Sequence, residues 1–341
     1  MSAHHGIACI GSSVVDELVP EIEPGQLTYV DANKFVTPEE LAGEELHYSV
    51  GGMALNVGVD LAKLDGGYPV SVFGKVGLDY RAEIVRTILR ENDISDDTLI
   101  VDKTHNTSST EVMHLRMPNG QIERFFRHTL GAMGAFSEKD IPVELLTSFK
   151  IALFGYGLLL PQLDLEDDEY GTVLGRVLAA TQKLNVQTAM DFVSPNAENM
   201  FRFMRYRKTL NFVDIICIND DQACALTQHD DPEKACIALV EDVHAGIAAV
   251  HCGAEGPNYA YSHQDGLKVR GNFAVPEKEY VGNAGAGDAF MAGFLHSMHR
   301  EWPLEKALEF AAAAAAVSLG DVSCTGAMKS EQEILNYIKN R

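Results

Sequence analysis

The sequence predicts an α/β protein in which a mostly parallel central sheet is covered by helices on both faces. Beyond residue 150, short apolar runs typical of buried strands alternate with segments whose apolar residues recur at helical spacing. This alternation is typical of strand–helix–strand units, which build parallel sheets. Residues 26–50 and 98–127 break the rhythm with short β-like pieces, and we interpret them as a small lid over one edge of the sheet.

The first part of the chain combines the lid pieces with the first strands and helices. Strands are predicted at apolar or β-branched runs, and helices where apolar residues repeat at helical spacing. Asn119-Gly120 between two β-like runs is typical of a hairpin turn. We expect strands at residues 6–10, 47–50, 70–73, 99–101, 110–117 and 122–126, and helices at 54–64 and 80–91.

The second part of the chain follows the strand–helix alternation throughout. We expect strands at 151–154, 188–192, 215–218 and 247–252, and helices at 172–184, 232–241, 286–299, 304–318 and 331–338. The predicted domains are a large α/β domain of residues 1–25, 51–97 and 128–341 and a lid of residues 26–50 and 98–127. Ligands of such sheets bind at the carboxyl ends of the strands.

The strong negative charge of the chain narrows its partners. The 341 residues include 27 Lys and Arg against 49 Asp and Glu, a formal net charge of −22 at pH 7. Such a surface repels nucleic acids and anionic lipid, so we expect neither partner. If the substrate is an anion, a local positive field must come from helix ends, backbone N–H groups or a metal.

Apolar runs and cysteines indicate the compartment. No apolar run is long enough to span a membrane, and the N-terminus lacks the basic flank of a signal peptide. The six cysteines include no Cys-x-x-Cys pair, and some lie within apolar runs, as in Ile216-Cys217-Ile218. Buried free thiols in a reducing compartment are the favoured interpretation. We therefore expect a soluble cytoplasmic protein.

The segment Gly285-Ala286-Gly287-Asp288 is the most informative in the chain. Its glycines precede a long amphipathic segment, which is typical of a tight turn leading into a helix. The free N–H groups of such a turn carry the positive end of the helix dipole and are able to bind an anion. Asp288 is then a candidate base that accepts a proton from a substrate hydroxyl. Its alternative role is to complement the helix dipole.

Two further segments offer groups for a hydroxyl-rich ligand. Gly51-Gly52 precedes a predicted helix, and glycines let the backbone approach a ligand closely. Asn56 follows in that helix and both donates and accepts hydrogen bonds, which suits the vicinal hydroxyls of a sugar. Its alternative is a polar helix residue beside an ordinary turn. Asp16, after the first strand, is able to hold two hydroxyls at once.

In their order along the chain, these segments resemble the ribokinase-like (PfkB) family of carbohydrate kinases, and the resemblance covers nearly the whole chain. The segments that carry it are Gly51-Gly52-x-Ala54-x-Asn56, Gly74-x-Val76-Gly77-x-Asp79, Asp191 to Pro195, Asn219 to Gln222, His251 to Gly256 and Gly285 to Phe290. The resemblance implies a three-layer α/β/α sandwich with a small β-sheet lid, whose large domain binds both nucleotide and substrate.

The resemblance also implies an activity, because the family transfers the γ-phosphoryl group of ATP to an alcohol of a sugar or nucleoside. It implies that Asp288 is the base and that the N–H groups of Gly285, Ala286 and Gly287 form an anion hole. It assigns residues to the acceptor (Asp16, Gly51, Gly52, Asn56, His128) and to the nucleotide (Asn219, Gly253, Gly256, Cys324, Gly326). Mg²⁺ is expected near Asn219 and Gln222, held by phosphates and water without a direct protein ligand. Lid strands of two subunits often pair in the family, so a homodimer is also expected.

Two positions depart from the family pattern near the nucleotide. Gln222 replaces the glutamate of Asn-x-x-Glu, so it keeps hydrogen bonding but loses the charge that helps order the water shell of Mg²⁺. Gly282-Asn283-Ala284 stands where the family usually has Asp-Thr-x. The missing acid often helps to hold a monovalent cation, so we expect weak or no activation by potassium.

The segment from Arg124 to Met133 resembles the connection between lid and core, where sugar kinases often have Asn in place of Met133. Phe126 and His128 are candidate acceptor contacts, and core packing is the alternative for Phe126. Arg124 or Arg127 would suit an acceptor that already carries phosphate or carboxylate. Solvated lid residues are the simpler interpretation of both arginines.

Two alternatives accompany the leading hypothesis of an ATP- and Mg²⁺-dependent sugar kinase. An adenosine-type nucleoside kinase needs aromatic rings that stack on the base, and the first 60 residues offer only Tyr29, Phe35 and Tyr48. A catalytically weak member that binds a sugar or nucleotide as a sensor is suggested by Gln222. The intact Asp288 argues against that sensor.

Overall fold

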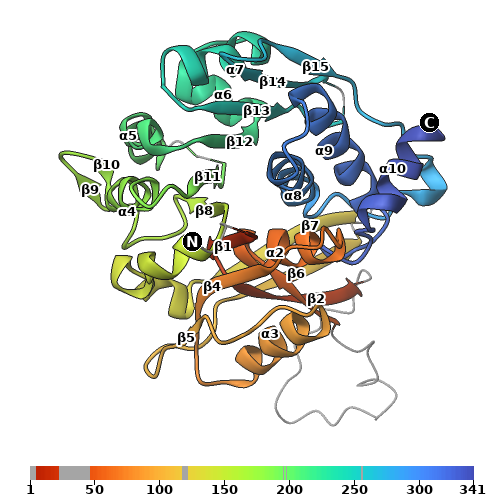
Figure 1. The fold of residues 1–341 in the computed structure, drawn as a ribbon. Coiled ribbons are helices and arrows are strands. Elements are labelled where there is room, and N and C mark those ends of the chain that lie inside the picture. The colour runs from red at the N-terminus through yellow and green to blue at the C-terminus, as the bar shows by residue number, and fades with distance from the viewer. Residues whose placement is uncertain (1–4, 23–46, 117–121, 195, 197, 255) are drawn as a thin grey trace, which may run out of the picture.

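A computed structural model describes residues 5–22, 47–116, 122–194, 196, 198–254 and 256–341 of the chain. Within these residues the chain forms a nine-stranded sheet, a four-stranded sheet and a two-stranded hairpin (Figure 1). The nine strands lie in the order β15-β14-β13-β12-β11-β8-β1-β4-β5. In that order their bounds are Lys268–Arg270, Asn258–Ser262, Ile247–His251, Ile215–Asn219, Gln187–Phe192, Ile151–Gly157, Ile7–Gly11, Val70–Val76 and Leu99–Val101.

The nine-stranded sheet is mostly parallel, as predicted. Every neighbouring pair from β5 to β13 is parallel, whereas β14 and β15 extend the edge beyond β13 as antiparallel strands. β1 is buried along its whole length, which accounts for its unbroken apolar sequence. β14 and β15 are absent from the predicted strands because neither contains an aliphatic run.

Helices cover both faces of this sheet (Figure 1). Alternate strand residues point to opposite faces. Cys9 and Leu153 pack with α2, α8 and α9 in one core, and Ile10 and Phe154 pack with α4 to α7 in the other. These two cores make the predicted three-layer arrangement. The helices are α2 (Met53–Lys63), α3 (Tyr80–Glu91), α4 (Val173–Gln182), α5 (Met200–Thr209), α6 (Asp220–Thr227), α7 (Pro232–Glu241), α8 (Ala286–His299), α9 (Leu304–Ser318) and α10 (Glu331–Lys339).

α5 and α6 are not among the predicted helices. α5 has ten residues, of which only Phe203, Tyr206 and Thr209 are buried, and α6 has eight residues. Both are too short and too polar for a repeating apolar pattern to stand out. Single 3₁₀ turns complete the loops: η1 (Gly131–Ala135), η2 (Glu138–Asp140), η3 (Val143–Ser148), η4 (Leu210–Phe212) and η5 (Glu277–Glu279).

The four-stranded sheet has the order β3-β2-β6-β7. Its strands are His47–Gly51, Val14–Ile22, Ser109–Arg116 and Ile122–Thr129, and β6 and β7 pair antiparallel as expected of the predicted hairpin. The rest of the predicted lid, residues 26–46, and the turn at 118–121 lie outside the described residues.

Two strands lie in a different sheet from the one that the predicted boundaries imply. β2 pairs with β3 and β6 in the small sheet, although residues 1–25 were assigned to the large domain. Buried Val15 alternates with half-buried Val14 and Asp16, a pattern of a sheet with one solvent-facing side. β5, assigned to the lid, instead pairs parallel with β4 at the edge of the large sheet.

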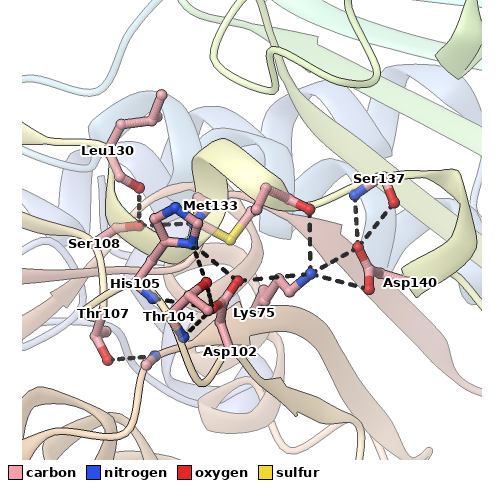
Figure 2. Close-up of polar contacts among 12 residues, drawn as sticks. Lys75, Asp102, Thr104, His105, Thr107, Ser108, Leu130, Met133, Ser137 and Asp140 are labelled. Atoms are coloured by element: carbon pink, nitrogen blue, oxygen red, sulfur yellow. Dashed lines mark hydrogen bonds and ion pairs between the residues drawn. The ribbon is translucent and has the colours of Figure 1, made fainter.

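Polar contacts fix the segments that join the large domain to the small sheet (Figure 2). Lys75 on β4 donates from Nζ to Asp140 Oδ2 at 3.1 Å and to the carbonyl of Ala135 at 3.2 Å, both after β7. Ser108, just before β6, donates from Oγ to the carbonyl of Leu130, just after β7. Lys75 therefore ties the segment after β7 to β4 of the large sheet, and the Ser108 bond joins the two ends of the β6–β7 hairpin to each other.

The segment Gly74 to Asp79, which resembles a family signature, serves the same junction. Asp79 caps α3 by accepting from Ala82 N at 3.1 Å, and it also accepts from Thr107 N at 2.8 Å and Thr107 Oγ1 at 2.7 Å. A Cβ on Gly77 would lie 2.5 Å from Thr107 N, so a side chain there would push this loop away. The segment therefore positions the small sheet.

Two further findings concern the predicted compartment. All six cysteines are free thiols, and Cys9, Cys217 and Cys236 are buried, as the sequence indicated. No helix of the described part of the chain is both long and apolar enough to cross a membrane.

Candidate active site

A cleft of about 760 Å³ lies between the small sheet and the carboxyl ends of the large sheet's parallel strands. Residues of β2, β6 and β7 line it, together with residues of β8, β11, β12 and the start of α8. This is where a parallel sheet places its ligands. The predicted site residues that line the cleft are Asp16, Gly52, Asn56, His128, Asn219, Gln222, Gly285, Ala286, Gly287, Asp288 and Cys324.

Asp288 lies in the first turn of α8, and its side chain forms part of the cleft wall. It is only 5% exposed. Tyr156 donates from its hydroxyl to Asp288 Oδ1 at 2.5 Å, and Asn56 donates from Nδ2 to Asp288 Oδ2 at 2.8 Å. Burial raises the pKa of Asp288 above its usual value, and the two hydrogen bonds act in the opposite direction. Both oxygens of the carboxylate therefore accept a hydrogen bond from the protein, and the side chain still lines the cleft.

The turn before α8 presents backbone amides to the same cleft. Gly285 has a φ of +76°, and a Cβ there would lie 2.6 Å from the carbonyl oxygen of Cys324. Within the described part of the chain, the N–H groups of Gly285 and Gly287 have no hydrogen-bond acceptor, whereas Ala286 N makes a long contact of 3.4 Å to the carbonyl of Asn283. Free amides at a helix start are suited to hold an anion.

Asp16 stands on the small-sheet side of the cleft. A Cβ on Gly51 would lie 2.3 Å from Asp16 Oδ1, so Gly51 leaves the space that this carboxylate occupies. Burial raises the pKa of Asp16 to about 6, a hydrogen bond with Thr110 lowers it, and the charge of Asp288 raises it. The thiol of Cys324 lies 3.9 Å from Asp16 Oδ2. Asp16 and Asp288 thus belong to one electrostatic site.

Gly52 begins α2 with a φ of +80°, and a Cβ there would lie 2.6 Å from the carbonyl oxygen of Ser12. That carbonyl accepts from Ala54 N at 3.1 Å. Asn56 follows one turn later, and its Oδ1 is buried with no partner among the described residues. The helix start therefore delivers one unused acceptor atom to the cleft.

The strand pair β6–β7 contributes the outer wall. His128 Nδ1 and Thr110 Oγ1 lie 3.0 Å apart across the two strands. Phe126 is 54% exposed, and its ring is parallel to that of His128. The alternative prediction, that Phe126 packs in the core, is therefore wrong. Met133, which stands where sugar kinases often have Asn, is buried beneath the cleft.

Gln222 has a structural role that its sequence context did not suggest. Asn219 N donates to Gln222 Oε1 at 3.0 Å, and Asn219 Oδ1 accepts from Gln222 N at 2.8 Å, which caps α6 reciprocally. Gln222 Nε2 donates to the carbonyl of Phe192 at 2.8 Å, a bond that a carboxylate cannot make. Both ends of the amide are thus used within the protein.

Four predicted residues do not line the main cleft. Gly51 acts through Asp16, as described above. Gly253 and Gly256 lie in the turn after β13, where Asn272 Nδ2 donates to both of their carbonyls, and Gly256 lines a separate depression of about 550 Å³. Gly326 lies beside the carboxylate of Asp321, and its N–H donates to Ser323 Oγ at 3.1 Å.

Sequence reasoning missed Tyr156 and Asp191 among the residues that line the cleft. Tyr156 lies near the end of β8, and Asp191 near the end of β11; Asp191 was noted only within a family-like segment. Burial raises the pKa of Asp191 well above its usual value, and the charge of Asp288 adds to this. The signal for both was a polar side chain at the carboxyl end of a buried strand, the position at which parallel sheets bind ligands.

Comparison with known proteins identifies relatives along nearly the whole chain. A family model described as "pfkB family carbohydrate kinase" matches residues 19–331. A 5-dehydro-2-deoxygluconokinase of Geobacillus thermodenitrificans is 23% identical over 331 residues, which cover 91% of this chain and 90% of that protein. An Arabidopsis thaliana ribokinase complexed with ribose and ATP has a TM-score of 0.76 at 20% identity, covering 98% of this chain and 99% of that one. A putative ribokinase II from E. coli in complex with ATP and Mg²⁺ has a TM-score of 0.74 at 16% identity, with coverage of 99% and 100%.

Proposed function

The chain belongs to the pfkB family of carbohydrate kinases and has the ribokinase fold, and on this premise we propose that it transfers the γ-phosphoryl group of Mg·ATP to a hydroxyl of a small sugar. One observation carries the proposal. The Asp288 carboxylate and the free N–H groups of Gly285 and Gly287 lie at the same helix start, in the wall of one cleft. A base and an anion-binding turn are the two devices that phosphoryl transfer to an alcohol requires.

Asp288 is the proposed base. The acceptor oxygen forms a bond to the γ-phosphorus, the bond from that phosphorus to the bridging oxygen of ADP breaks, and the acceptor proton passes to Asp288. A carboxylate suffices if the proton leaves late, once the oxygen has begun to bond to phosphorus. Burial raises the pKa of Asp288, which makes it a better base than an exposed aspartate. The amides of Gly285, Ala286 and Gly287 would stabilise the charge of the transferred group.

Hydroxyl groups suit the acceptor end of the cleft. Asn56 Oδ1 is buried without a partner among the described residues, and the Asp16 carboxylate faces the same space. Both are acceptor atoms that need donors, and a buried acceptor without one is costly. A ligand with several hydroxyls would supply those donors. His128, hydrogen-bonded to Thr110, offers a further polar contact from the small sheet.

The residues near Asn219 fit Mg²⁺ that is carried by ATP. Among the described residues, no three His, Cys, Asp or Glu side chains converge on a point that could hold a metal. Asn219 and Ser194 line this wall of the cleft, and both are able to bond to phosphate oxygens or to metal-bound water. When bound, Mg²⁺ would neutralise phosphate charge, which the strongly acidic chain does not do itself.

A nucleoside acceptor is the second candidate, because the exposed ring of Phe126 lines the cleft and could stack on a base. A panel of neutral pentoses and hexoses, sugar acids and nucleosides, incubated with Mg·ATP, distinguishes the candidates by ADP release. We expect turnover with a sugar. Turnover confined to nucleosides would establish the alternative. Ligand binding by calorimetry without turnover on any acceptor would identify a sensor.

The role of Asp288 has its own test. Asp288→Asn is expected to lower kcat by roughly a thousandfold or more while the dissociation constants of sugar and ATP change little. Asp168→Asn, at an exposed position between β9 (Glu166–Asp167) and β10 (Gly171–Thr172), is the matched control. A variant Asp288→Asn that retains most of its turnover would overturn the assignment of the base.

A further inference from the structure

We propose that Tyr156 is a positioning residue for the Asp288 base, whose hydroxyl fixes the orientation of the carboxylate and favours its ionised form. This inference rests on the proposed function. It adds a residue that lies far from Asp288 in the sequence, in a segment that carries no family signature.

The geometry places Tyr156 on one side of the carboxylate and Asn56 on the other. Tyr156 approaches Oδ1 from the end of β8, and Asn56 approaches Oδ2 from the first turns of α2. The terminal torsion of an aspartate is soft and has no sharp minimum. Two donors from two separate elements remove that freedom. The remaining lone pairs of the carboxylate then keep one direction toward the acceptor hydroxyl, which is the positioning that proton transfer requires.

Burial opposes the ionisation of Asp288, and its charge in turn acts on the buried acids around it. Burial is the largest cause that raises the pKa of three neighbouring acids, Asp60 on α2, Asp16 on β2 and Asp191 on β11. The charge of Asp288 raises all three further, whereas the hydrogen bond from Thr110 lowers the pKa of Asp16. The pKa of the Cys324 thiol, before α10, is raised by burial and then by the charges of Asp16, Asp288 and Asp60.

Lys63 on α2 lowers the pKa of Asp60, but it does not line the cleft. None of the described lining residues is a Lys or Arg. His251, on β13, lies close to Gly287, but burial lowers its pKa to about 4 and leaves it neutral. The groups that favour ionised Asp288 are therefore the two hydrogen-bond donors, Tyr156 and Asn56. The Tyr156 proton itself stays in place, because burial and the charge of Asp288 raise the pKa of this phenol well above its usual value.

Tyr156→Phe tests the inference because it removes the donor and keeps the ring. The kinetic experiment measures kcat and kcat/KM of the full chain against pH, with saturating Mg·ATP and the sugar found by the acceptor panel. We expect the acid limb of the profile to move to higher pH and kcat to fall roughly tenfold to hundredfold on that limb, with recovery toward the wild-type value at high pH. The KM for ATP should stay unchanged.

A second measurement does not depend on turnover. Aspartate labelled with ¹³C at the carboxyl carbon is titrated by NMR, and the Asp288 resonance is assigned by its loss in Asp288→Asn. In Tyr156→Phe this resonance should titrate at higher pH than in the wild type. The control is Tyr261→Phe, which removes a tyrosine–carboxylate hydrogen bond to Glu241 at the surface and should leave both the rate profile and the Asp288 titration unchanged.

The outcomes separate this inference from the proposed function. A moved titration without turnover on any acceptor would leave the positioning role standing and reject the kinase assignment. Turnover with an unmoved acid limb and an unmoved Asp288 titration would overturn the positioning role alone. A loss of kcat of equal size at every pH, together with an unmoved Asp288 titration, would also overturn it, since a purely structural change gives that result.

Discussion

Asn56 on α2 donates to Asp288 on α8 across 2.8 Å, and so joins two helices that both begin at glycine-rich turns. α2 and α8 pack against each other on the same face of the large sheet. The bond therefore couples the turn that carries Asp288 to the turn beside Asp16. One side chain links the proposed phosphate end of the cleft to its acceptor end.

Asn56→Asp should damage the base without changing the shape of the site. The substitution places a second carboxyl group beside Asp288, in an environment that is already buried and acidic, and this raises the pKa of Asp288 further. We expect kcat at neutral pH to fall roughly a hundredfold. Steady-state kinetics across the pH range measures the effect, and the isosteric change Asn336→Asp on the exposed surface of α10 is the control. Wild-type kcat in Asn56→Asp would contradict the assigned hydrogen bond.

Gly51→Ala should weaken acceptor binding through Asp16. A Cβ at Gly51 would lie 2.3 Å from Asp16 Oδ1, so the carboxylate must turn away from its place in the cleft. We expect the KM for the acceptor to rise about tenfold, with a smaller effect on the KM for ATP. Gly271→Ala, where a Cβ meets open space, is the matched control. Equal changes in both KM values would point to general distortion and not to Asp16.

Gln222→Glu restores the residue that the family usually has, yet we expect it to destabilise this protein. The carboxylate would lose the 2.8 Å donation from Nε2 to the carbonyl of Phe192 and would set two oxygens against each other in a buried position. The expected cost is about 1–3 kcal/mol in the free energy of unfolding, measured by urea titration. Gln264→Glu, at an exposed position in the turn after β14, controls for the added charge. A more stable Gln222→Glu with a lower requirement for Mg²⁺ would instead show that the amide is a defect.

Local signals in the sequence were sufficient for some parts of the site. Asp288 and Asn56 were singled out because each stands beside a glycine pair at a predicted helix start, and both line the cleft. The parallel sheet followed from runs such as Ile151 to Phe154, whose burial on both faces demands continuous apolar sequence.

Other parts depend on pairing between distant segments, which a single sequence does not reveal. Tyr156 and Asp191 enter the cleft only because β8 and β11 are neighbours in the sheet. β2 was not predicted as a strand, and residues 1–25 were assigned to the large domain, because its partner strands β3 and β6 follow much later in the chain. The structural role of Gln222 depends on its hydrogen bond to the carbonyl of Phe192, and the position of that carbonyl cannot be inferred from residue spacing in the sequence.

Asp16 should control the pH dependence of acceptor binding. Burial raises the pKa of Asp16 to about 6, so its carboxylate is ionised at neutral pH and becomes protonated as the pH falls through that value. A protonated carboxyl has fewer acceptor sites for sugar hydroxyls. We therefore expect the KM for the acceptor to rise between about pH 7 and pH 5, beyond any change in kcat that Asp288 causes. Asp16→Asn should have a raised KM that is flat over this range.

The raised pKa of Asp16 also predicts that the folded protein becomes less stable as the pH rises, whereas acceptor binding becomes tighter. Because the pKa of Asp16 is higher in the folded chain than in the unfolded one, the folded state binds the proton more tightly. Its contribution to stability is fully present below about pH 4 and is lost as the pH rises through about 6. Urea titrations of the ligand-free protein at several pH values should therefore show a decline over this window that is smaller in Asp16→Asn. Identical pH dependence in the two proteins, for both KM and stability, would mean that Asp16 titrates as an ordinary exposed carboxylate and does not form the acceptor end of the cleft.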